Sequence, residues 1–218
     1  KNQVEFGGST RFGSKSRQAF GGLYRFADYN LNSVLTSIGK TLMKMDTTME
    51  TGKRSLKLSK YKQSLEGINF NKDHPYTSVL RVFPAWELNR ENLQAVVTFP
   101  VINTYNDLQN FKRLPFFRLI IVIGTVSDLV YDPIIENYKP LVEELHGVSE
   151  TLIGGWNSTQ TILPKQTMTV QMPESRVALL TSDVTVLLSM GVEFGNVGFA
   201  GEPVVAKNIG SGKVIAAS

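Results

Sequence analysis

The longest run of apolar positions lies near the middle of the chain, at residues 114–126. Aromatic and β-branched side chains dominate it, Pro115 stands at its start, and Ser127 and Asp128 follow it. These features are typical of a central β-strand. Because the run scarcely alternates, we expect a packed layer on each face of this strand. It is shorter than the roughly 20 apolar residues of a membrane-spanning helix and Arg118 interrupts it, so no transmembrane segment is predicted.

Other stretches of the chain alternate or are rich in β-branched residues, which is typical of shorter strands. They are residues 76–83, 93–102, 166–172, 184–194, 204–206 and 214–217, the last two joined by a turn at 208–212. Turn-forming residues separate them. The pattern predicts a mainly β body over residues 46–218, built as an antiparallel β-sandwich of jelly-roll or immunoglobulin type.

A helical period precedes this body, at residues 23–45. Apolar residues recur there at steps of three and four, at Leu23, Phe26, Ala27, Leu31, Val34, Leu35, Ile38, Leu42 and Met45. This spacing predicts one amphipathic helix of roughly six turns. Its apolar stripe must be covered, either by the sheet of the same subunit or by a neighbouring subunit.

Residues 1–22 show neither period and are rich in glycine, serine and basic residues. This composition predicts a flexible basic arm. Phe6, Phe12 and Phe20 each precede a glycine within it. Together with Leu23 and Phe26, these phenylalanines are candidate anchors in grooves of a neighbouring copy of the chain; the alternative is that they pack on the chain's own surface.

The charge is distributed unevenly along the chain. Residues 1–62 hold twelve basic and four acidic residues, whereas the whole chain has a formal net charge of +4. A basic N-terminal third suits a polyanion such as nucleic acid, an acidic surface on a neighbouring copy, or simple solvation. The candidate polyanion-binding residues are Arg11, Lys15, Arg17, Lys53, Arg54, Lys57, Lys60 and Lys62. Between residues 53 and 62 the lysines interleave with apolar residues, and the favoured interpretation is that they guard an exposed edge strand.

Candidate chemistry is sparse. The chain has no cysteine and two histidines, His74 and His146, neither within a recognised motif; we expect a turn residue and a surface residue. Residues 209–213 lack the pattern of a phosphate-binding loop. We therefore predict no catalytic residue, no metal site and no cofactor. Trp86 and Trp156 are expected to pack in the core, the alternative being a carbohydrate-binding platform.

One segment, residues 31–71, carries a resemblance. Its motifs are Val34-Leu35-Thr36, Met45-Asp46-Thr47-Thr48, Gly52-Lys53-Arg54 and Leu65-Glu66-Gly67-Ile68-Asn69-Phe70-Asn71. The segment resembles the N-terminal part of uncharacterised hypothetical proteins of the Bacteroidota. The resemblance implies no activity, cofactor or site residue, and so favours a function outside the familiar enzymes.

Taken together, these patterns predict a non-enzymatic structural subunit. The basic arm would dock on a neighbouring copy and build a filament, tube or shell, in an assembled particle or an extracellular filament. A nucleic-acid-binding, coat-like protein and a carbohydrate-binding sandwich are the alternatives.

Overall fold

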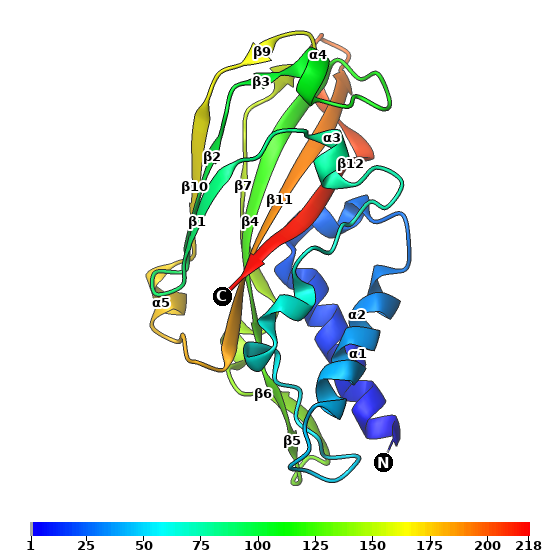
Figure 1. Cartoon of the computed structure of the whole chain (residues 1–218), viewed down its shortest axis with the longest axis vertical. Coiled ribbons are helices and arrows are strands. Elements are labelled where there is room, and N and C mark those ends of the chain that lie inside the picture. Colours follow the sequence, from blue (N-terminus) through cyan, green and yellow to red (C-terminus); the bar gives the residue numbers. More distant parts are fainter. Residues whose placement is uncertain (1) are drawn as a thin grey trace.

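A computed structural model describes residues 2–218 and shows three layers around one long antiparallel sheet (Figure 1). This large sheet has the order β12 (Pro203–Ala217), β11 (Val184–Val197), β4 (Phe116–Ser127) and β7 (Val148–Ile153), with β8 (Asn157–Ser158) also paired to β4. A small sheet of β1 (Ala85–Asn89), β2 (Gln94–Phe99) and β10 (Gln166–Gln171) covers one face. Helices α1 (Asn2–Ala19) and α2 (Leu31–Lys44), with the 3-10 helix η1 (Gly21–Phe26), cover the other. The predicted mainly β, antiparallel fold with an N-terminal helix is confirmed.

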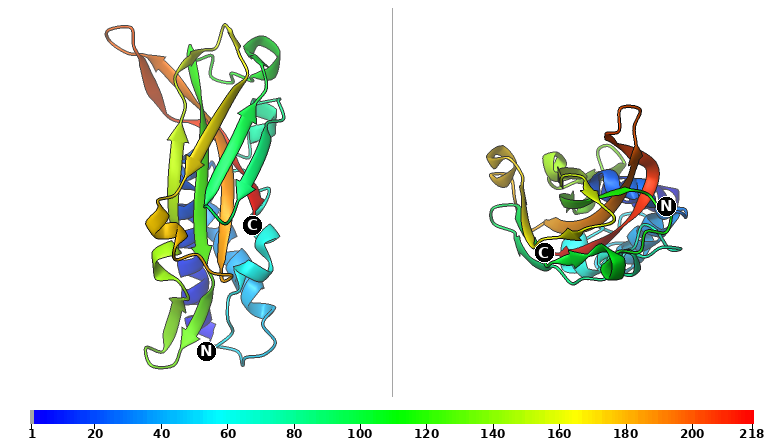
Figure 2. Two further views of the ribbon diagram at one scale, coloured as in Figure 1. Left: turned by 90° about the vertical axis from the view of Figure 1, so that its left-hand side faces the viewer. Right: turned by 90° about the horizontal axis from the view of Figure 1, so that it is seen from above.

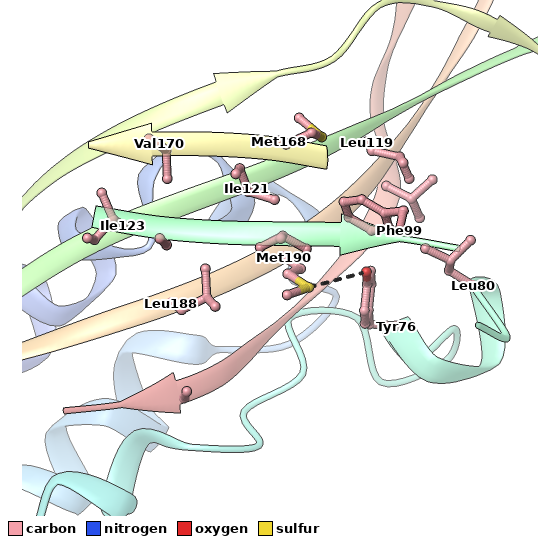
Figure 3. Packing of buried hydrophobic residues seen from close by; sticks show 14 of the residues in the cluster. Tyr76, Leu80, Phe99, Leu119, Ile121, Ile123, Met168, Val170, Leu188 and Met190 are labelled. Carbon is pink, nitrogen blue, oxygen red and sulfur yellow. Dashed lines mark hydrogen bonds between the residues drawn. The ribbon is translucent and has the colours of Figure 1, made fainter. Parts of the chain in front are cut away.

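Strand β4 is buried on both faces, as its unbroken apolar run predicted. Phe117, Leu119, Ile121 and Ile123 face the core between the two sheets, and Figure 3 shows part of this cluster. Alternate residues of the strand, including Ile120 and Val122, face the core beneath the helices. One strand therefore serves two hydrophobic cores.

The molecule is elongated, and short elements occupy its two ends (Figures 1 and 2). The hairpin of β5 (Leu129–Asp132) and β6 (Asn137–Pro140) forms one end, which we call the β5–β6 end. The tip joining β11 to β12, together with β3 (Ile102–Asn103), α4 (Thr104–Asp107) and β9 (Ile162–Leu163), forms the opposite β11–β12 end. The remaining elements are η2 (Leu58–Lys60), η3 (Lys62–Leu65), α3 (Tyr76–Val79), η4 (Glu143–Leu145) and α5 (Glu174–Val177).

The predicted flexible arm is wrong for residues 2–19, which form helix α1. Its buried positions repeat at helical spacing: Glu5, Gly8, Ser9, Phe12, Gly13, Ser16 and Ala19, and Phe20, directly after the helix, is buried as well. Glycine costs a helix about 1 kcal/mol relative to alanine, but here small residues allow close packing. A Cβ atom at Gly8 would lie 2.6 Å from the ring of Tyr138 and 2.7 Å from Met43 of α2.

The helix predicted over residues 23–45 is divided in two. Its first part is the 3-10 helix η1, and the chain leaves helical geometry at Ala27, whose φ and ψ are −66° and 125°. Helix α2 then begins after Asn30, whose side chain accepts a hydrogen bond of 3.1 Å from the backbone N–H of Ser33. This N-cap satisfies one of the free donors of the new helix, so a second start is stable.

Two predicted strands have other structures. Residues 76–79 form helix α3, since the carbonyl of Pro75 accepts hydrogen bonds from Ser78 and Val79. Residues 53–62 contain η2 instead of an edge strand, and Leu56 and Leu58 are buried beneath the helices. The lysines of this segment therefore do not guard an edge strand.

The predicted turn at residues 208–212 lies inside the continuous strand β12. Its pairing with β11 shifts register between Glu193 and Gly195, and Asn208 has a φ of 60°. Gly212 leaves room for a neighbouring side chain, because a Cβ there would lie 3.0 Å from the ring of Phe70. Gly212 therefore serves close packing, and residues 208–212 do not reverse the chain.

Candidate interaction surfaces

Four of the five candidate docking residues are buried inside the chain's own core. Phe12, Phe20 and Leu23 are 0% exposed and Phe26 is 2% exposed, all between the helices and the large sheet. In this fold they cannot anchor a neighbouring copy, so this prediction is corrected. Phe6 alone of the five is exposed, at 52%, with the amine of Lys40 lying 4.5 Å from the centre of its ring.

Three of the candidate polyanion-binding residues are engaged with carboxylates. Arg11 pairs with Glu143 at 3.3 Å, Lys53 with Glu50 at 2.7 Å and Arg54 with Glu5 at 2.7 Å.

The other five candidates divide by position. Lys15 and Arg17 lie on α1, where Lys15 packs beside Gly147 and Arg17 lies 5.2 Å from the ring centre of Tyr24. Lys57, Lys60 and Lys62 lie together around η2 and η3. The structure therefore separates the predicted set into three residues paired with carboxylates, two further residues on α1 and a cluster of three lysines.

Exposed apolar side chains gather at the β11–β12 end. Phe199, in the hairpin tip, is fully exposed, and Val197 beside it is 53% exposed. The tip projects away from the sheets in Figure 2. Tyr105 of α4 and Ile162 of β9, at the same end, are 72% and 60% exposed. Beyond Gly195, β11 has no pairing with β4, so two strands alone carry this tip.

The β5–β6 end presents a second apolar group. Ile134 and Ile135, in the turn of the hairpin, are 90% and 57% exposed, and Leu141 follows the hairpin at 45%. Exposed charges of both signs lie at each end. Glu136 and Glu144 lie at or near the β5–β6 hairpin together with Lys139, and Lys112, Arg113 and Lys165 lie in loops next to the β11–β12 end, whose tip holds Glu202.

A buried ion cluster holds the helical layer onto the sheet. Glu193 of β11 has a side chain 1% exposed and pairs with Arg25 of η1 and with Arg118 of β4. The Arg118 guanidinium donates to the Glu193 carboxylate at 2.6 Å and lies 4.2 Å from the ring centre of Trp156. A buried carboxylate needs such partners. Nothing in the spacing of these residues along the sequence points to the cluster.

The two histidines differ in environment. His146 was predicted at the surface but is 1% exposed, between the turn after η4 and helix α1, and this prediction is wrong. Neither of its ring nitrogens has a hydrogen-bond partner among residues 2–218. Burial, with Arg11 and Lys15 nearby, lowers the pKa of His146 to about 4. His74 stacks on Phe111 with ring centres 3.9 Å apart.

The two tryptophans come from different sheets. Trp86 of β1, predicted to pack in the core, is 48% exposed, because it lies on the outer strand of the small sheet. Trp156 precedes β8 of the large sheet, is partly buried and packs against Gly195.

Within residues 2–218, no group of three or more histidine, aspartate or glutamate side chains is placed to hold a metal ion. None of the helices in this part of the chain has the length and apolar character needed to cross a membrane. No protein-family model, curated protein or solved structure matches the chain. The resemblance of residues 31–71 therefore stays an expectation.

Proposed function

We propose that this chain is a non-enzymatic structural subunit that assembles head to tail with copies of itself. The observation that carries the proposal is the pair of exposed apolar groups at opposite ends of an elongated molecule, around Phe199 and around Ile134. Exposed apolar clusters of this kind mark interaction sites. The buried arm residues do not take part, so the contact uses the hairpins.

A contact between two different ends is heterologous, and such contacts need not close into a ring. Repetition of the contact then gives a filament or, with a lateral contact added, a tube or a shell. Each end carries exposed charges of both signs, so pairs such as Lys112 with Glu136 and Glu202 with Lys139 can form across this contact. An assembled particle or extracellular filament is the setting that fits this proposal.

Two single substitutions test the proposal. Phe199→Ser and Ile134→Ser each remove one apolar end from an exposed turn, so folding should be retained and assembly lost. Leu179→Ser is the matched control, because Leu179 follows α5, away from both ends, and is 39% exposed. Light scattering and negative-stain microscopy across a concentration series give the readout. A wild-type chain that stays monomeric throughout, or variants that assemble like the control, would overturn the proposal.

A further inference from the structure

A group of lysines lies around the C-terminal half of helix α2 and the turns that follow it. Lys40 and Lys44, four residues apart, lie on the same side of α2 and are exposed. The chain then returns, so that Lys57 and Lys60 line a hollow with Leu42 and Met45 at the end of that helix. Lys62 begins η3 directly afterwards. Lys40 and Lys44 line a second hollow, together with Glu5, Phe6 and Arg54. We call the two groups together, Lys40, Lys44, Lys57, Lys60 and Lys62, the lysine face.

Three carboxylates lie near the lysine face. Glu5 pairs with Arg54, and the charge of Lys57 favours the ionised forms of Asp46 and Asp128. None of its five amines forms an ion pair with a carboxylate in the part of the chain that the structure describes. Asp46 lines the hollow of Lys57 and Lys60, but its oxygens accept hydrogen bonds from Thr48 and from the backbone N–H of Ser55. This differs from the paired Arg11, Lys53 and Arg54. Like charges four residues apart on a helix destabilise it by a few tenths of a kcal/mol, so an external anion is favoured here.

Two purely structural roles do not account for these five lysines. They do not protect an edge strand, because residues 58–60 and 62–65 form the 3-10 helices η2 and η3. Lys44 does complement the helix dipole in the last turn of α2, but the dipole acts within that turn and does not explain Lys57, Lys60 or Lys62.

We infer that the lysine face binds the phosphate backbone of nucleic acid. Several exposed amines along one surface neutralise successive phosphates and release their counterions, which gives binding without sequence preference. Tyr61, at 37% exposure, is the one aromatic side chain lining the hollow of Lys57 and Lys60, so stacking contributes little beside charge. The inference does not rest on the proposed assembly, because it uses the helical layer and not the two hairpins.

The inference is tested by fluorescence anisotropy over a salt series. The probe is a labelled single-stranded nucleic acid of about 30 nucleotides, which is long enough for several phosphate contacts. The variant Lys40→Gln, Lys44→Gln, Lys60→Gln is compared with Lys112→Gln, Lys165→Gln, Lys207→Gln. The two variants remove the same charge from exposed positions, the second set lying outside the lysine face.

The wild type should bind with an affinity that falls steeply with salt. The lysine-face variant should lose roughly 10-fold or more in affinity at low salt, and its slope of log affinity against log salt should be shallower by about 2, at about 0.7 per phosphate contact. The control variant should keep most of its affinity.

Three results would overturn the inference. The first is absence of binding by the wild type at low salt. The second is an equal loss in both variants, which would make net charge and not the lysine face responsible. The third is equal binding of poly-glutamate, which would make the partner an acidic protein surface. None of these bears on head-to-tail assembly, which light scattering reports separately.

Discussion

At the scale of single residues, the buried imidazole of His146 links stability to pH. Its pKa is lowered from 6.5 to about 4 in the folded chain, mainly by burial. The unfolded chain therefore binds the proton more tightly, and stability falls as the pH drops from 6.5 toward 4. Arg11 and Lys15, which lie on the neighbouring face of α1, oppose protonation further. The sequence did not reveal this, because a histidine next to two glutamates looks like a surface residue.

We expect the free energy of unfolding to fall by roughly 2–3 kcal/mol between pH 7 and pH 4 through this group, at about 1.4 kcal/mol per pKa unit. His146→Leu should remove that part of the pH dependence, which urea unfolding at several pH values would measure. Because carboxylates also titrate in this range, the difference between wild type and variant is the relevant quantity. An identical pH profile for the two proteins would show that His146 is not responsible.

At the scale of elements, strands were predicted correctly where the pattern of apolar residues indicated which positions are buried. The unbroken run of β4 and the alternation of β10, with Met168 and Val170 facing inward, were readable from the sequence. Helix α1 was missed because its buried stripe is made of glycine, serine and alanine, with Phe12 and Phe20 as the large apolar members. Small residues leave no hydrophobic period, although close packing requires them.

Ion pairs between residues far apart in the chain could not be predicted from the sequence either. The carboxylate of Glu193 and its partners Arg25 and Arg118 are separated by 168 and 75 residues, so their meeting depends on the tertiary fold. The exposed apolar residues of the hairpin tips were not predicted for a similar reason. Phe199 and Ile134 are ordinary apolar residues until the structure places them at opposite ends of the molecule.

The attachment of α1 to the sheet can be tested at Gly124. A Cβ at this position of β4 would overlap the carbonyl of Ala19 at the end of α1, so Gly124→Val should lift the helix from the sheet. We expect a loss of about 1–3 kcal/mol in stability, typical of overpacking, with faster amide hydrogen exchange in α1. Gly155→Val is the control, because a Cβ there meets no atom within 4 Å. Unchanged exchange in α1 of the Gly124 variant would contradict this packing.

At the scale of the whole molecule, the proposed contact has a direction that mixing can reveal. Phe199→Ser keeps an intact β5–β6 end, and Ile134→Ser keeps an intact β11–β12 end. An equimolar mixture of the two variants should therefore form a dimer and stop, since both remaining ends are altered. Light scattering would measure this mass, with each variant alone as a monomeric control. Dimers of either variant by itself would show instead that like ends meet.

The antiparallel pairing of β4 with β11 has a mechanical consequence. All 12 residues of β4 pair with β11, from Ser127 opposite Val184 to Phe116 opposite Gly195. β4 leads almost directly into β5 at one end, and β11 leads into the tip at the other. Tension between the two ends would pull these neighbours past each other along their length. Because ladder hydrogen bonds lie across the strands, they would bear this shear load together. This arrangement suits a subunit of a filament that is under tension.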